Sequence, residues 1–127
     1  MHGSSTLPKS ERIQRGWQFR RAYEHGRKAV GRLLVLYVVD DPPDSPHTGT
    51  PAGRAVGVVT SRKVGNAVTR NRARRLLREA YRQNKLKLRT HLQIVMVARV
   101  AINGKRLPDV EAELLQLFRA AGILNET

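Results

Sequence analysis

Hydrophobic residues along the chain follow two spacings, one typical of helices and one typical of buried strands. Apolar residues recur at helical intervals in three stretches, and β-favouring residues form three short continuous runs. The helices are expected over residues 16–25, 66–85 and 109–121, and the strands over residues 33–39, 55–60 and 92–100. The order α-β-β(-β)-α-β-α, which allows a further strand before the central helix, predicts an α+β sandwich with one mixed sheet of about four strands and three packed helices. We expect the first two of these strands to pair with each other.

Chain length and proline distribution predict a single domain with one long loop. A chain of 127 residues suits one domain, which we place at residues 7–124. Residues 1–6 are small and polar, so they are expected to form a disordered tail. Residues 40–53 contain four of the six prolines together with Ser, Thr and Gly, which predicts a mobile loop.

The first predicted helix carries half of the aromatic residues of the chain. Trp17, Phe19 and Tyr23 form its apolar side together with Ala22. Two interpretations remain open, because such residues either pack in the core or form a platform on which unpaired nucleotide bases stack. Tyr37, on the first predicted strand, would complete such a platform.

The central predicted helix has one apolar and one strongly basic side. A helical wheel places its apolar residues in a compact stripe, expected to be core. These residues are Ala73, Leu76, Leu77, Ala80 and Tyr81. The opposite side holds Asn71, Arg75, Arg78 and Arg82, flanked by Arg72 and Arg74. A glycine and an N-cap candidate, Gly65 and Asn66, precede the helix and would point free backbone N–H groups at the same partner.

The distribution of charge along the chain indicates what kind of partner this basic side binds. Lys and Arg outnumber Asp and Glu by 24 to 10, a formal charge of +14, and residues 62–89 hold eleven of the cations against one acid, Glu79. An ordinary solvated helix face would intersperse acids that pair at i,i+4. Because these cations lack such compensation and are mostly arginine, whose fork binds phosphate in a bidentate manner, the pattern predicts a nucleic acid partner.

Several other classes of protein are excluded by composition. There is no cysteine for a disulfide or a thiolate, and the longest apolar run, residues 33–39, is far too short to span a bilayer. No signal peptide is visible, so a cytoplasmic location is expected. The four histidines are scattered, and Asp40, Asp41 and Asp44 lie in the proline-rich loop, which is a poor scaffold for metal ligands. The residues alone therefore predict an RNA- or DNA-binding protein without catalytic residues of its own.

One continuous segment resembles a known family. Residues 63–81 read KVGNAVTRNRARRLLREAY, which is similar to the signature of the bacterial ribonuclease P protein component. The resemblance extends over about residues 7–122. It includes Phe19 and Tyr23 followed by His25-Gly26 in the first helix, and Leu36-Tyr37 in the first strand.

This resemblance implies a fold, a partner and a set of site residues. The family fold has a left-handed β-α-β crossover, whereas general rules favour a right-handed one. The family protein joins a catalytic RNA and promotes magnesium-dependent removal of the 5′ leader from precursor tRNA, with Mg²⁺ held mainly by RNA and substrate. The resemblance therefore implies no catalytic or metal-binding residue on the protein, no membrane and no obligate protein partner. The implied contacts to the catalytic RNA are Lys63, Arg70, Asn71, Arg72, Arg74, Arg75 and Arg78. The implied leader-binding cleft is formed by Phe19, Tyr23 and Tyr37.

Three other functions compete with this one. A ribosomal-type structural RNA-binding protein would share the charge but not the segment 63–78. A stand-alone nuclease would need carboxylates on rigid elements. A DNA-compacting protein would need no cleft for a single strand.

Overall fold

The computed structural model describes residues 11–13, 15–40 and 53–125. The predicted tail, and all of the predicted loop except its ends, lie outside these residues. The helices are α1 (Gly16–His25), α2 (Ala67–Asn84) and α3 (Leu107–Ala120), and the strands are β1 (Arg27–Val30), β2 (Leu34–Asp40), β3 (Ala55–Val59) and β4 (Leu92–Ala98). Two short 3₁₀ turns follow α2 and β4, at Lys85–Lys87 and Val100–Ile102. The prediction of three helices and a mixed four-stranded sheet in one α+β domain is confirmed. Within the described residues, no helix is long and apolar enough to cross a membrane.

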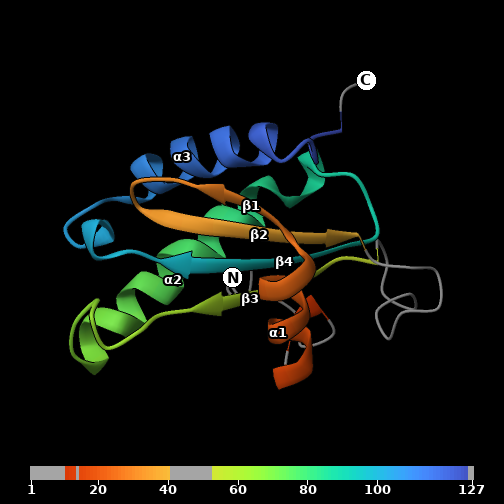
Figure 1. The fold of residues 1–127 in the computed structure, drawn as a ribbon. Helices are drawn as coiled ribbons and strands as arrows, with labels where there is room; N and C mark the ends of the chain where they lie inside the picture. The colour runs from red at the N-terminus through yellow and green to blue at the C-terminus, as the bar shows by residue number, and fades with distance from the viewer. Residues whose placement is uncertain (1–10, 14, 41–52, 126–127) are drawn as a thin grey trace.

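The sheet has the strand order β1-β2-β4-β3 (Figure 1). Strand β2 runs antiparallel to both of its neighbours, β1 and β4, whereas β3 runs parallel to β4. The expectation that β3 pairs with β2 is wrong, because β4 lies between them. Central position suits β4, whose residues are all buried except Val97, since a central strand is covered on both faces and both edges.

Strand β1 is the element that hydrophobic pattern did not place. It has four residues, three of them exposed, and lies at the edge of the sheet, where it pairs with β2 from Arg27 opposite Val38 to Val30 opposite Val35. Charged residues are common on such edges, because they oppose pairing with other chains. An edge strand of this kind has too few apolar residues to reveal itself by alternation.

The two faces of the sheet are covered by different helices. Leu36 and Met96 face a large core formed with α2 and α3, whereas Tyr37 and Val95 face a smaller cluster beneath α1. Figure 1 shows α1 in front of the sheet and α2 behind it. In α2 the predicted core stripe is confirmed, since four of its five residues are buried and Leu76 packs against the same core.

The connection from β3 through α2 to β4 is left-handed. The two strands are parallel neighbours, and in Figure 1 both point left, with β4 above β3 and α2 behind the sheet. Parallel strands joined in this way are right-handed in about 98% of cases. A right-handed connection would have placed α2 on the other face of the sheet. The family resemblance therefore predicted the hand of this connection where the general rule did not.

A single carboxylate closes the turn between β1 and β2. Glu113, on α3, accepts hydrogen bonds from the backbone N–H groups of Arg32 (2.9 Å), Leu33 (2.8 Å) and Leu34 (3.0 Å). Three backbone donors thus share one charged acceptor, and such charge-assisted bonds are among the stronger ones in proteins. This contact fixes the β1–β2 turn to the helix layer.

Candidate RNA-binding surfaces

Two of the three aromatic residues expected to bind an RNA strand, Phe19 and Tyr37, pack against the smaller cluster, and Tyr23 contacts Tyr37. We call Phe19, Tyr23 and Tyr37 the aromatic face. The rings of Tyr23 and Tyr37 meet edge to face with centroids 4.9 Å apart, and Lys28 Nζ lies 5.8 Å from the Tyr37 centroid. Burial, and then Tyr37, raise the pKa of the Tyr23 hydroxyl, so this phenol stays neutral at physiological pH.

Phe19 lies in this face because residue 57 has no side chain. A Cβ at Gly57 would come within 2.6 Å of Phe19 Cε1, so only glycine lets the ring approach β3 so closely. Phe19 is half-buried against the cluster that contains Ile13 and Ala22, whereas Tyr23 is 42% exposed. The core-packing interpretation thus suits Phe19, which is half-buried, and the base-stacking interpretation suits Tyr23, whose ring is accessible to a ligand.

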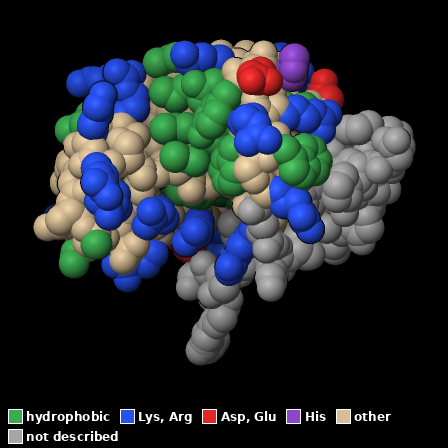
Figure 2. Space-filling model, turned by 60° about the horizontal axis from the view of Figure 1, so that its bottom comes forward, with side chains coloured by type: hydrophobic (Ala, Val, Ile, Leu, Met, Phe, Trp, Pro, Cys, Tyr) green, Lys and Arg blue, Asp and Glu red, His purple; other side chains and the backbone are tan. Residues whose placement is uncertain are grey.

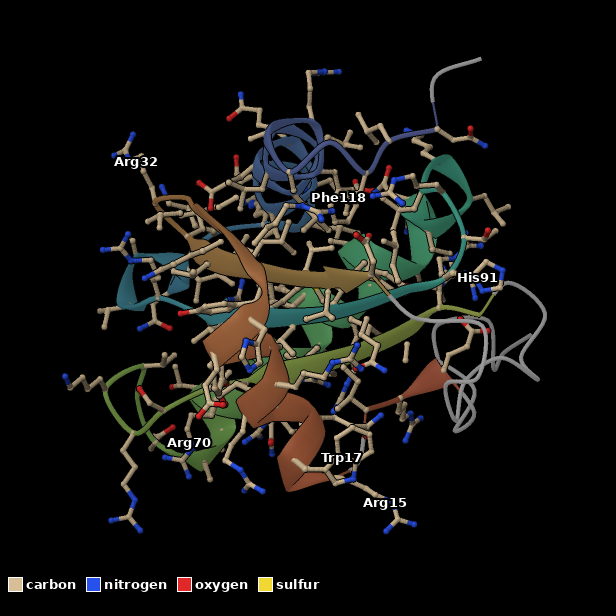
Figure 3. The ribbon with its side chains drawn as sticks, turned by 45° about the vertical axis from the view of Figure 1, so that its right-hand side comes forward. Arg15, Trp17, Arg32, Arg70, His91 and Phe118 are labelled. Atoms are coloured by element: carbon tan, nitrogen blue, oxygen red, sulfur yellow. The ribbon has the colours of Figure 1, made fainter. Side chains whose placement is uncertain are left out.

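The predicted apolar side of the first helix is partly wrong. Trp17 is 41% exposed, and the buried residues of α1 are Gln18 and Ala22. The Gln18 side chain accepts a hydrogen bond from the backbone N–H of Arg15 at 3.2 Å, so a polar residue is buried here by closing the first turn. Figure 3 shows Trp17 and Arg15 projecting from the N-terminal end of α1.

The start of α2 is built as the sequence predicts. Asn66 is the N-cap, and its side-chain oxygen accepts from the Thr69 backbone N–H at 2.9 Å. Gly65 has a φ of 152°, a conformation that residues with side chains rarely adopt. Arg70 Nη1 donates to the Gly65 carbonyl at 2.9 Å, which holds this arginine beside the helix start.

The predicted contacts to catalytic RNA lie along one side of α2 and the loop before it. Lys63, Asn71, Arg72 and Arg75 are exposed, and Arg70, Arg74 and Arg78 are half-buried. Besides Arg70, two of these arginines are oriented by hydrogen bonds within the protein. Arg74 Nη1 donates to Asn71 Oδ1 at 2.7 Å, and Arg72 Nη2 donates to the Lys105 carbonyl at 2.6 Å. The one acid of the helix, Glu79, is already paired with Arg82 through contacts of 3.0 and 2.7 Å, so it does not neutralise the others.

Three arginines crowd together where α2 meets the N-terminal segment. The pKa of Arg78 is lowered, first by burial and then by repulsion from Arg12 and Arg74. No local pattern marks Arg12, because it lies far from α2 in the chain and only the fold brings it there. We call Arg12, Arg74 and Arg78 the arginine cluster. A cluster of like charges in this position favours a bound polyanion, which relieves the repulsion.

The arginine cluster and the aromatic face are joined by the same short segment. Arg12 and Ile13 run beside β3, with the Ile13 backbone N–H donating to the Val56 carbonyl at 2.9 Å. Ile13 packs in the cluster beneath α1, while Arg12 lies close enough to Arg78 to affect its pKa. Figure 2 shows a face of the molecule on which hydrophobic side chains gather with Lys and Arg on either side. Consecutive residues thus link the arginine cluster to the packing beneath the aromatic face.

No metal centre accompanies these surfaces in the part of the chain that the structure describes. There, no three His, Asp or Glu side chains come together in a way that could hold a metal ion.

Comparison with known protein families shows the family to which this chain belongs. The sequence model of the family Ribonuclease P matches residues 7–122. The chain belongs to the family of bacterial ribonuclease P protein components. It is therefore a protein subunit of ribonuclease P, part of a ribonucleoprotein enzyme of tRNA processing, and its family implies the ribonuclease P RNA as partner. This membership removes the grounds for the ribosomal-type alternative.

Individual relatives and solved structures agree with this membership. The ribonuclease P protein component of Clostridium acetobutylicum is 39% identical over 116 residues, which cover 91% of this chain and 92% of the relative. That of Clostridium novyi is 35% identical over 94% of this chain and is covered completely. The solved ribonuclease P protein of Staphylococcus aureus superposes with a TM-score of 0.75 at 25% identity, covering 92% of this chain and all of the other. That of Thermotoga maritima gives 0.70 at 25% identity, covering 86% and 96% of the two chains.

Proposed function

We propose that this subunit binds the single-stranded 5′ leader of precursor tRNA on the aromatic face and the catalytic RNA along the basic side of α2. The observation that carries this proposal is the Arg12–Ile13 segment: Arg12 belongs to the arginine cluster, and Ile13 is buried in the cluster against which Phe19 and Tyr37 pack. A leader strand lying over Tyr23 and Tyr37 would stack its bases on rings, while phosphates nearby would meet the arginine cluster.

The chemistry of leader removal is then assigned to the RNA. In this proposal, Mg²⁺ is held by RNA and substrate phosphates, and the protein acts in the cytoplasm without catalytic residues. A dense group of cations reduces repulsion between two RNA molecules, so the protein favours docking of the precursor and lowers the Mg²⁺ concentration that docking needs.

Reconstitution tests this assignment directly. The full chain is mixed with a bacterial ribonuclease P RNA, and release of the 5′ leader is followed at low, near-physiological Mg²⁺. We expect cleavage that requires both components and none by the protein alone. Cleavage by the protein alone would overturn the assignment of chemistry to RNA, and failure to stimulate at any Mg²⁺ concentration would overturn the role as subunit.

Tyr23 offers a clean test of the leader surface, because it is exposed while Phe19 is packed. Replacing Tyr23 with Ala is expected to weaken precursor binding by about 1–3 kcal/mol, the value of one base–aromatic stack. Affinity for mature tRNA, which lacks the leader, should not change. The comparison is made by fluorescence anisotropy on the reconstituted ribonucleoprotein.

The matched control is Tyr23→Phe, which keeps the ring and should bind the precursor almost as well as the original protein. Equal weakening for precursor and mature tRNA would place the leader elsewhere. Circular dichroism of each variant separates loss of binding from loss of folding.

A further inference from the structure

A second cationic site lies at the end of the sheet where β3 leads into α2. A hollow of about 400 Å³ is lined there by three cations, Arg32, Lys63 and Arg99, together with the Ser61 hydroxyl. The rest of its wall is apolar and includes Val64 and Val100. No acid lines this hollow, and none of the three cations belongs to an ion pair within the described residues.

Each cation comes from a different loop, and each loop is held in place. Arg99 donates from Nη1 to the Gly31 carbonyl at 2.7 Å, and its backbone N–H donates to the Leu33 carbonyl at 2.9 Å. Arg32 lies in the turn that Glu113 fixes. Figure 3 shows its side chain reaching outward from the end of that turn.

The loop that carries Lys63 is also braced. The Lys63 backbone N–H donates to Ser61 Oγ at 3.3 Å, and Asn103 Nδ2 donates to the Val64 carbonyl at 2.7 Å. Three anchored loops with cationic side chains form a site whose geometry exists before a ligand arrives. Such preorganisation lowers the entropic cost of binding.

We propose that this hollow binds one nucleotide of an RNA chain, with its phosphate among Arg32, Lys63 and Arg99. The volume is within the range of pockets that hold small ligands, about 300–1,000 Å³, and the apolar wall would contact the sugar or base. Arginine donates five N–H groups, so Arg99 keeps four for a ligand after its bond to Gly31. The proposal rests on the RNA-binding function above and extends the RNA surface to the β1–β2 turn, which lies outside the segment 63–81.

Replacing Arg32 with Gln tests the site without disturbing the turn, because Glu113 is bound by the backbone of residue 32. The variant is compared with the original protein in two arms. The first measures binding of the catalytic RNA by the full chain, and the second measures binding of precursor tRNA by the reconstituted ribonucleoprotein. In the arm that supplies the nucleotide, we expect about three- to tenfold weaker binding and a salt-dependence slope reduced by about 0.7–0.9. The two arms thus identify which RNA enters the hollow.

The matched control is Arg119→Gln, which removes the same charge from an exposed position on α3 and should change neither arm. An unchanged affinity and slope for Arg32→Gln in both arms, or an equal loss for Arg119→Gln, overturns the proposal. The double variant Arg74→Gln/Arg78→Gln distinguishes a failure of the hollow from a failure of the proposed RNA surface of α2. If it weakens binding while Arg32→Gln does not, only the hollow is wrong; if neither does, the proposed RNA surface of α2 fails as well.

A second experiment detects the RNA by proximity. Because the chain has no cysteine, Ser61→Cys provides a single attachment point for an iron chelate that cleaves nearby RNA backbone. We expect one localised set of cuts in the assembled ribonucleoprotein, and none of these cuts from the same reagent at Gln116→Cys, an exposed position on α3. No cuts from position 61, or identical cuts from both positions, would contradict an RNA at this hollow.

Discussion

Replacing both Arg74 and Arg78 with Gln is expected to weaken binding of the catalytic RNA by two orders of magnitude or more. A hydrogen bond to a charged group contributes about 1.5–3 kcal/mol, and each 1.4 kcal/mol is about a tenfold change in affinity. The slope of log affinity against log salt should also fall by about 0.7–0.9 for each phosphate that no longer meets an arginine. Titration of labelled RNA at several salt concentrations measures both quantities.

The free protein should respond in the opposite direction. Burial, and then repulsion from Arg12 and Arg74, lower the pKa of Arg78, so removing two of the three charges relieves both the cost of burying Arg78 and the repulsion. We expect the thermal stability of the double variant to equal or exceed that of the original protein. A variant that binds RNA normally, or that loses binding only because it unfolds, would contradict the assignment of this cluster to RNA.

Replacing Glu113 with Ala is expected to cause the largest loss of stability among single surface substitutions. Three backbone N–H groups of the β1–β2 turn lose their shared acceptor, two of them in partly buried positions. A donor left unsatisfied in a buried position costs about 1–3 kcal/mol, so we expect a total loss of about 3 kcal/mol in the free energy of unfolding. Urea unfolding followed by circular dichroism measures this loss.

Gln116→Ala is the matched control, since Gln116 is exposed on the same helix and its replacement should change stability by less than about 0.5 kcal/mol. Glu113→Gln keeps one carbonyl acceptor and should fall between the two. Equal stability of Glu113→Ala and Gln116→Ala would show that water replaces the carboxylate at no cost. Because the hollow uses the same turn, Glu113→Ala should also weaken any RNA contact made there.

Helical periodicity was the most informative part of the sequence. It predicted α1 with its observed bounds and the core stripe of α2, since burial imposes a repeat that survives in any helix packed on a sheet. Periodicity wrongly predicted which side chains of α1 are buried. Gln18 is buried because its side chain closes the first turn of α1, and Trp17 is exposed although it is the largest apolar residue nearby.

Strand order and distant contacts were beyond the reach of local pattern. Adjacent strands in sequence usually pair, and this rule placed β3 beside β2, whereas β4 lies between them. Arg12 and Arg32 have no local motif that marks them, because their surroundings come from other parts of the chain. The RNA contacts proposed for all of the predicted site residues, on α2 and on the aromatic face alike, remain predictions.

The position of β4 in the sheet has a consequence for how the protein is made. This strand joins β2 to β3, yet it is the last of the four to be synthesised. While the ribosome is still translating residues before 92, the β1–β2 pair and the single strand β3 lack the strand that lies between them, and a hairpin of β2 with β3 is the nearest available mispairing. The native sheet therefore cannot form until β4 has been synthesised, and pairings between strands distant in sequence form slowly. Codon choice or a pause in translation near residue 92 would act on the interval in which this chain is most exposed to aggregation.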